Sequence, residues 1–127
     1  MKTRPSRRGL SLIEIIVVIT IIAMLMSAVG VYALGVQRTS QINTAKMDVK
    51  NAATALDVYR ANQGRYPDPR EGFAPVLAIR ALKKEPIDPW GTPLIWALED
   101  GEPVVTSLGP DRAKGGVGED ADITSAD

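Results

Sequence analysis

The sequence contains no cysteine and no histidine among its 127 residues. The lack of cysteine excludes a disulfide, so thiols say nothing about the redox compartment. The lack of histidine removes the usual general base, the usual pH switch and the commonest transition-metal ligand. Any bound metal is therefore expected to be a hard cation held by oxygen atoms.

The formal net charge is zero, but the charges are unevenly placed. The basic residues Lys2, Arg4, Arg7 and Arg8 all precede the first apolar run. The acidic residues gather towards the C-terminus, at Glu99, Asp100, Glu102, Asp111, Glu119, Asp120, Asp122 and Asp127. Because the basic cluster lacks interleaved aromatic residues, no nucleic-acid surface is expected.

A long apolar run follows the basic residues. Between Leu10 and Val36 the only charged residue is Glu14. The stretch Ile15–Val36 has about 22 uncharged residues, which as a helix measure ~33 Å and can cross a bilayer core. The basic residues are expected to stay cytoplasmic and to send the C-terminus outward. A secretory signal peptide is the alternative, because Met26-Ser27-Ala28 resembles a cleavage site, but its apolar core is usually shorter.

A helical pattern continues beyond this run. Apolar residues recur at spacings of three and four at Ile42, Ala45, Val49, Ala52, Leu56 and Tyr59. Gly64 is a candidate C-cap, and Pro67 disfavours continuation. We expect one helix of about 50 residues, half of it in lipid and half a spine for an outer domain. A separate second helix would require a break only near Gly35–Ser40.

The rest of the chain is expected to form a small domain on this spine. Residues 64–92 are proline-rich and indicate a connector with a short helix at Val76–Lys84. Strand-like runs at Pro93–Leu98 and Pro103–Ser107 surround the turn signal Glu99-Asp100-Gly101. Residues 109–118 indicate a loop, and 121–124 a last short strand. The predicted fold class is α+β, with a long N-terminal helix packed on a small C-terminal antiparallel sheet.

Glu14 is the first candidate functional residue. An intramembrane carboxylate costs several kcal/mol, so one that persists should have a partner. Cleavage after Gly9 would create an α-amino group on Leu10, which could pair with Glu14 of a neighbouring subunit. A simple snorkelling position at the cytoplasmic interface explains Glu14 equally well.

The segment Gly9-Leu10-Ser11-Leu12-Ile13-Glu14 resembles the class III signal of type IV pilins and pseudopilins. The resemblance implies cleavage between Gly9 and Leu10 by the prepilin peptidase, N-methylation of Leu10, and an assembly role for Glu14. It departs from the usual pattern in having Leu10 and Ser11, and in lacking a proline deeper in the helix, where Gly30 stands.

Three further blocks resemble the major pseudopilins of type II secretion systems. They are Leu56-Asp57-Val58-Tyr59-Arg60 followed by Asn62-Gln63-Gly64-Arg65-Tyr66-Pro67, then Asp88-Pro89-Trp90-Gly91-Thr92-Pro93, and the stretch from Ser107 to Ile123. Independently of this resemblance, Trp90, Tyr59 and Tyr66 are interpreted as packing residues of a small core. The implied organisation is a leader at 1–9, a transmembrane and assembly helix at 10–36, and a periplasmic domain at 37–127. Within that domain the spine covers 37–63, the connector 64–92, and the sheet with the acidic loop 93–127.

The acidic loop has two interpretations. Its carboxylates, separated by glycines, could form a solvated tail, or could hold calcium, which takes six to eight oxygens. The spacing does not fit an EF-hand. The resemblance implies a bound Ca²⁺, because the corresponding loop of major pseudopilins binds it. By that carry-over the ligands are the side chains of Asp111 and Asp120 and the carbonyls of Leu108 and Ala113, with Asp122 and Glu119 as secondary candidates.

The resemblance implies a structural subunit that polymerises into the periplasmic pseudopilus of a type II secretion system and drives exoprotein export. Its implied partners are further copies of itself, minor pseudopilins, prepilin peptidase, the inner-membrane assembly platform and inner-membrane lipid. It would be a single-pass inner-membrane protein with its C-terminal domain in the periplasm. The alternatives are a type IV pilin or minor pseudopilin and, from another class, a membrane-anchored enzyme. The last is disfavoured because no Gly-x-Ser-x-Gly motif, P-loop or paired-acid spacing occurs.

Overall fold

A computed structural model of the chain describes residues 9–127. It divides into two units, the first reaching to Arg38 and the second running from Thr39 to Asp127. The boundary falls within the first helix, α1, so each unit is described by itself. Residues 1–8 of the predicted leader lie outside the described residues.

Helix α1 spans Leu12–Gln63, a length of 52 residues. The described helix shows no interruption at 35–40, so the single helix expected from the sequence is confirmed. It ends as predicted at Gly64, which has a φ of +77° and donates its N–H to the carbonyl of Arg60 at 2.7 Å. Glycine adopts this left-handed conformation without a steric penalty.

The core of the second unit lies against one face of α1. Its buried residues on the helix are Ala45, Val49, Ala52, Ala55 and Leu56, which confirms the predicted stripe and adds Ala55. The segments after α1 contribute the buried side chains of Phe73, Val76, Leu94, Trp96, Val105 and Ile123. Tyr59, Tyr66 and Trp90 are partly buried and pack on this cluster, in agreement with the packing role expected of them.

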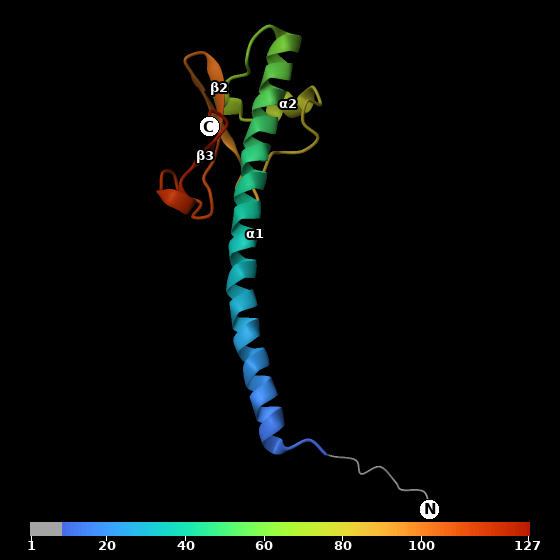
Figure 1. Cartoon of the computed structure of the whole chain (residues 1–127). Helices are drawn as coiled ribbons and strands as arrows, with labels where there is room; N and C mark the ends of the chain where they lie inside the picture. The colour runs from blue at the N-terminus through green and yellow to red at the C-terminus, as the bar shows by residue number, and fades with distance from the viewer. Residues whose placement is uncertain (1–8) are drawn as a thin grey trace, which may run out of the picture. The chain divides into compact units, whose positions relative to one another are not determined.

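A three-stranded antiparallel sheet covers this face (Figure 1). Its strands are β1 (Ile95–Glu99), β2 (Glu102–Ser107) and β3 (Ile123–Thr124), paired in the order β1-β2-β3. Asp100 and Gly101 join β1 to β2 with φ values of +52° and +86°, as a two-residue hairpin requires. The predicted hairpin, the last short strand and the α+β fold class are therefore confirmed.

The short helix predicted at Val76–Lys84 is wrong in extent, because α2 covers only Ala74–Ala78. Arg80 adopts a φ of +59°. Its N–H donates to the carbonyl of Leu77, and the N–H of Ala81 donates to that of Val76 at 3.1 Å. This pattern closes a helix C-terminus. The apolar spacing continued past the point at which the backbone turned, so periodicity alone overextended the helix.

Two single-turn 3₁₀ helices were not predicted from the sequence. They are η1 (Pro69–Glu71), which Asp68 caps by accepting the N–H of Arg70 at 2.9 Å, and η2 (Gly118–Asp120) in the acidic loop.

Candidate functional site

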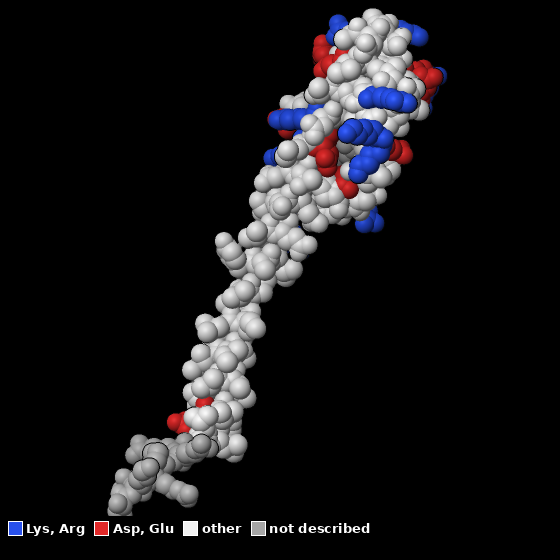
Figure 2. Space-filling model, turned by 90° about the vertical axis from the view of Figure 1, so that its right-hand side faces the viewer, with Lys and Arg blue, Asp and Glu red and all other residues white. Residues whose placement is uncertain are grey.

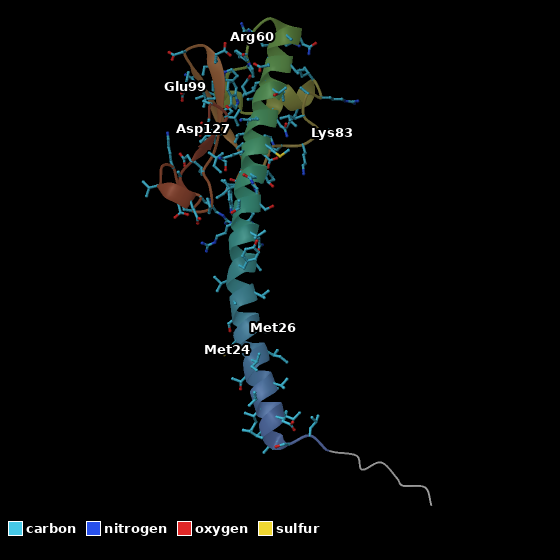
Figure 3. The ribbon with its side chains drawn as sticks, viewed as in Figure 1. Met24, Met26, Arg60, Lys83, Glu99 and Asp127 are labelled. Atoms are coloured by element: carbon cyan, nitrogen blue, oxygen red, sulfur yellow. The ribbon has the colours of Figure 1, made fainter. Side chains whose placement is uncertain are left out.

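The first unit presents an apolar helical surface to its surroundings. An 18-residue window of α1 near the N-terminus has a mean hydropathy of 2.8, and none of that window is buried inside the protein. Figure 2 shows an almost uniformly uncharged surface over the described part of this unit, and Met24 and Met26 point outward in Figure 3. Exposed side chains of this kind are stable in lipid or against other apolar helices, so this segment of α1 is a candidate membrane anchor.

Glu14 has a local partner at the beginning of α1. Its Oε2 accepts a hydrogen bond from the backbone N–H of Ser11 at 2.7 Å. Ser11 directly precedes Leu12, the first helical residue, and Glu14 is the third residue of the helix. This is the returning half of a capping box, which satisfies an N–H that the helix itself leaves unpaired. The sequence Ser11-x-x-Glu14 is the pattern of a capping box, but the sequence-based prediction for Glu14 considered only its charge.

The predicted processing point lies just outside the helix. Gly9 and Leu10 have no regular secondary structure, and Leu10 is 77% exposed. The peptide bond between them is therefore not part of the hydrogen-bonded helix. A shallow, mostly apolar hollow lined by Leu10, Ile13, Glu14, Val17 and Val18 lies beside the carboxylate.

The acidic loop in the second unit is organised by two of its aspartates. Oδ1 of Asp111 accepts the N–H of Ala113 at 3.0 Å. Oδ2 of Asp122 accepts the N–H of Gly115 at 3.0 Å, and the N–H of Asp122 donates to the carbonyl of Gly115 at 3.1 Å. The Asp122 contacts close the loop between its middle and its end.

The second carboxylate oxygen of Asp122 is unusual. Within the described part of the chain, its Oδ1 is buried and has no hydrogen-bond partner. A buried carboxylate oxygen without a donor costs free energy, so it marks a place where a cation could bind. Sequence reasoning ranked Asp122 behind Asp111 and Asp120, because the packing that buries it depends on the loop closing back on Gly115.

Two glycines bring the loop backbone close to the carbonyls that precede Asp122. A Cβ on Gly116 would lie 2.1 Å from the carbonyl oxygen of Asp120, and one on Gly109 would lie 3.1 Å from that of Ala121. Any larger residue at 116 would have to move the backbone. The glycines thus permit a loop in which backbone oxygens and the Asp122 carboxylate approach one another.

The other predicted ligands are less closely gathered. Asp111, Ala113, Glu119 and Asp120 are exposed, and Leu108 is half-buried. Across residues 9–127, no three acidic side chains lie close enough together to form a metal-binding cluster. The candidate ligands are all oxygen atoms, which is the donor type that calcium prefers. Asp122 stands out among them because its Oδ1 is buried without a hydrogen-bond partner.

Two family models together match most of the sequence. The model described as "Type II secretion system (T2SS), protein G" matches residues 31–126, and "Prokaryotic N-terminal methylation motif" matches residues 4–30. The second match contains Gly9, Leu10 and Glu14.

Curated relatives agree with this assignment. The chain is 32% identical to a Type II secretion system core protein G of Pseudomonas aeruginosa, over 98% of both chains. It is 33% identical to that of Escherichia coli, over 98% of this chain and 94% of the relative. It is 28% identical to that of Vibrio cholerae, over 97% and 94%.

The apolar helix with its capped carboxylate, the small sheet and the acidic loop therefore occur in a chain that belongs to the type II secretion system protein G family.

Proposed function

We propose that this chain is a structural subunit that polymerises through its N-terminal helix into the periplasmic pseudopilus of a type II secretion system, and so drives exoprotein export. One observation carries the proposal: α1 exposes an apolar surface over its first half, with Glu14 as the only charge between Leu10 and Val36. Such a helix is stable in a bilayer before assembly and among copies of itself afterwards.

Before assembly, α1 would anchor each subunit in the inner membrane. The basic residues Lys2, Arg4, Arg7 and Arg8 favour a cytoplasmic N-terminus. The domain from residue 37 onward would then lie in the periplasm. Figure 2 is in keeping with this division, since basic and acidic side chains lie in patches on the visible face of the second unit.

Prepilin peptidase would hydrolyse the peptide bond between Gly9 and Leu10. The exposure of Leu10 and its place before the first helical residue support access to this bond. N-methylation of the new amino group on Leu10 would follow, in keeping with the matched methylation motif.

Glu14 would then orient an incoming subunit. In the single chain its carboxylate accepts the Ser11 N–H. In the filament, the methylated ammonium of a neighbour's Leu10 would provide the positive partner that an intramembrane carboxylate needs. One carboxylate can accept both bonds, because it has two oxygens. Helix capping and subunit pairing are thus compatible.

The acidic loop would hold a calcium ion. We propose Asp122, Asp111 and Asp120 as side-chain ligands and the carbonyls of Leu108 and Ala113 as backbone ligands, with Glu119 as a further candidate. The buried, unpartnered Oδ1 of Asp122 supports this assignment. The ion would offset repulsion among the carboxylates and stabilise a small domain that contains no cysteine.

The role is structural and not enzymatic. The proposed partners are further copies of the chain, minor pseudopilins, prepilin peptidase and the inner-membrane assembly platform. The match to the protein G family over 31–126 favours this assignment over a type IV pilin or a minor pseudopilin.

Mass spectrometry of the N-terminus tests the proposal. In cells with prepilin peptidase, the mature chain should begin at a methylated Leu10, and sheared filaments should contain this form. In cells without the peptidase, the chain should keep residues 1–9 and form no filaments. A chain that polymerises with its leader intact, or one that is trimmed without the peptidase, would contradict the proposal.

A further inference from the structure

Asp88 is a buried carboxylate that the proposed function leaves unused. The residue is 4% exposed. Oδ1 accepts the N–H of Trp90 at 3.1 Å and that of Thr92 at 2.8 Å. The backbone completes the turn, with the N–H of Gly91 donating to the Asp88 carbonyl at 3.0 Å. Burying a carboxylate is unfavourable unless it is hydrogen-bonded, and these bonds fix the turn at residues 88–92.

The other oxygen of Asp88 reaches out of the turn. Its Oδ2 accepts the hydroxyl of Ser107 at 2.8 Å, and Ser107, the last residue of β2, is fully buried. The hydroxyl oxygen in turn accepts the N–H of Gly109 at 3.2 Å. Both hydrogen bonds run in one direction, from Gly109 through Ser107 to the charge on Asp88. A chain ending on a charge in a buried setting strengthens each of its bonds.

This chain of hydrogen bonds determines where the acidic loop begins. Gly109 lies so close to the end of the loop that a Cβ there would be 3.1 Å from the Ala121 carbonyl oxygen and 3.7 Å from that of Asp120. The bond to Ser107 holds this position. It thereby places the start of the loop against the residues that precede Asp122.

A second link joins the same loop to the same turn. Arg112, whose φ of +57° is rare for a residue other than glycine, donates from Nη2 to the carbonyl of Trp90 at 2.6 Å. The turn at 88–92 is thus linked to the loop twice, indirectly from the Asp88 carboxylate through Ser107 and directly from the Trp90 carbonyl.

We infer that Asp88 is a positioning residue that orders the acidic loop at 108–122, acting through Ser107, before any cation binds. The consequence for calcium rests on the proposed function, but the ordering itself does not. A loop already closed loses less conformational entropy on binding, so the Asp88–Ser107 pair would also increase calcium affinity.

Hydrogen exchange of the full-length chain in detergent micelles, with chelator present, tests the ordering. Ser107→Ala removes the link but leaves both turn bonds at Oδ1 of Asp88. We expect amide exchange across 109–122 to become roughly tenfold faster, while the spine at 45–56 changes less than about twofold. Asp88→Asn should accelerate exchange in the same loop, since an amide cannot both accept the two turn N–H bonds and accept the Ser107 hydroxyl.

Val76→Ala is the matched control. It removes buried volume within α2, away from the Asp88–Ser107 link, and should accelerate exchange without singling out the loop. Unchanged loop exchange in Ser107→Ala would overturn the inference. So would an increase spread over the spine and the loop in the pattern that Val76→Ala produces.

Calcium titration of the same full-length proteins separates the two proposals. Ser107→Ala should bind Ca²⁺ roughly tenfold more weakly than the parent chain. If the parent chain itself binds no Ca²⁺, the calcium proposal fails, and the exchange comparison alone decides the role of Asp88. If loop exchange rises while calcium affinity stays the same, the positioning role for calcium is overturned.

Discussion

The phenol of Tyr66 donates a 2.7 Å hydrogen bond to Oδ1 of Asp57, which joins the segment after α1 to the last turns of that helix. Arg60 donates from Nη1 to the same phenol oxygen at 3.2 Å, and its guanidinium lies 5.0 Å from the ring centroid. Arg60, labelled in Figure 3, is also 3.9 Å from Glu102, the first residue of β2. These contacts fasten the C-terminal end of the spine to the hairpin.

Tyr66→Phe should lower the free energy of unfolding of the second unit by about 1 kcal/mol, because it removes the hydroxyl while keeping the ring. Thermal melting of the full-length chain in detergent measures the change. A double-mutant cycle with Asp57→Asn isolates the pair, and we expect most of the loss to appear as coupling between the two positions. Additive effects would mean that the hydroxyl contributes through another contact.

Asp48 lies in a groove of about 310 Å³ between α1 and residues 82–87. Burial raises the pKa of its carboxyl, the negative charge of Asp88 raises the pKa further, and Lys84 opposes both effects. The folded chain therefore takes up this proton at a higher pH than the unfolded chain does. Stability falls as the pH rises through the window between the unfolded value, 3.8, and the raised pKa.

Asp48→Asn should therefore raise the melting temperature at pH 7. The gain in the free energy of unfolding should stay below about 1 kcal/mol, because the site is only partly buried. Near pH 3 the difference should vanish, since both side chains are then uncharged. Glu99→Gln, at an exposed position in the hairpin, is the control and should change little at pH 7. A variant less stable than the parent chain at pH 7 would contradict this prediction.

Gly116→Ala should distort the acidic loop more than Gly115→Ala. Both glycines have left-handed backbones, with φ of +92° and +100°, so both substitutions carry a conformational cost of about 1 kcal/mol. Only the new Cβ at 116 would collide with the Asp120 carbonyl, while that at 115 would meet nothing within 4 Å. The free energy of unfolding of Gly116→Ala should therefore be lower than that of Gly115→Ala by a further ~1–3 kcal/mol. Thermal melting and limited proteolysis measure the difference. Equal effects would show that the backbone angle alone matters.

The proposed calcium site predicts that a chelator lowers the melting temperature of the second unit. With calcium at a hundred times its dissociation constant, the stabilisation is about 2.7 kcal/mol. Asp122→Asn should abolish most of this difference, while Glu99→Gln should preserve it. Magnesium should not substitute, because it demands a tighter octahedral site. An unchanged melting temperature on chelation would contradict the calcium proposal.

Glu14→Gln separates the two roles of that side chain. The amide oxygen can still accept the Ser11 N–H, so the helix should begin as before, but the charge is lost. We expect normal processing and at least a roughly tenfold loss of filament. Filament yield by electron microscopy, with total mature protein as the reference, measures the effect. Normal assembly of Glu14→Gln would mean that assembly does not need the negative charge.

Periodicity predicted the elements whose interactions are local. The stripe from Ile42 to Tyr59 identified the buried face of α1, and Gly64 identified its end, because helical spacing and a capping glycine are both patterns within a short stretch of sequence. The Asp100-Gly101 turn predicted the hairpin for the same reason. The end of α2 was missed because Arg80 adopts a backbone angle that its residue type does not suggest.

In the candidate sites, too, short-range contacts were predictable from the sequence and long-range contacts were not. Ser11 and Glu14 are three residues apart, so their bond was predictable from the capping pattern. The link from Asp88 to Ser107 spans 19 positions, and no local pattern in the sequence indicates it. The orphaned oxygen of Asp122 depends on loop closure, which composition does not specify.

Three of the five buried residues on α1 are alanines, so the helix contributes a shallow surface to the core and the segments after it supply most of the bulk. A helix with such small side chains on its buried face imposes few demands on the shape of the segments that pack against it. Domains with different loops and sheets could therefore be exchanged on the same helix if other side chains filled the space above those alanines. The apolar N-terminal part of α1 would not need to change.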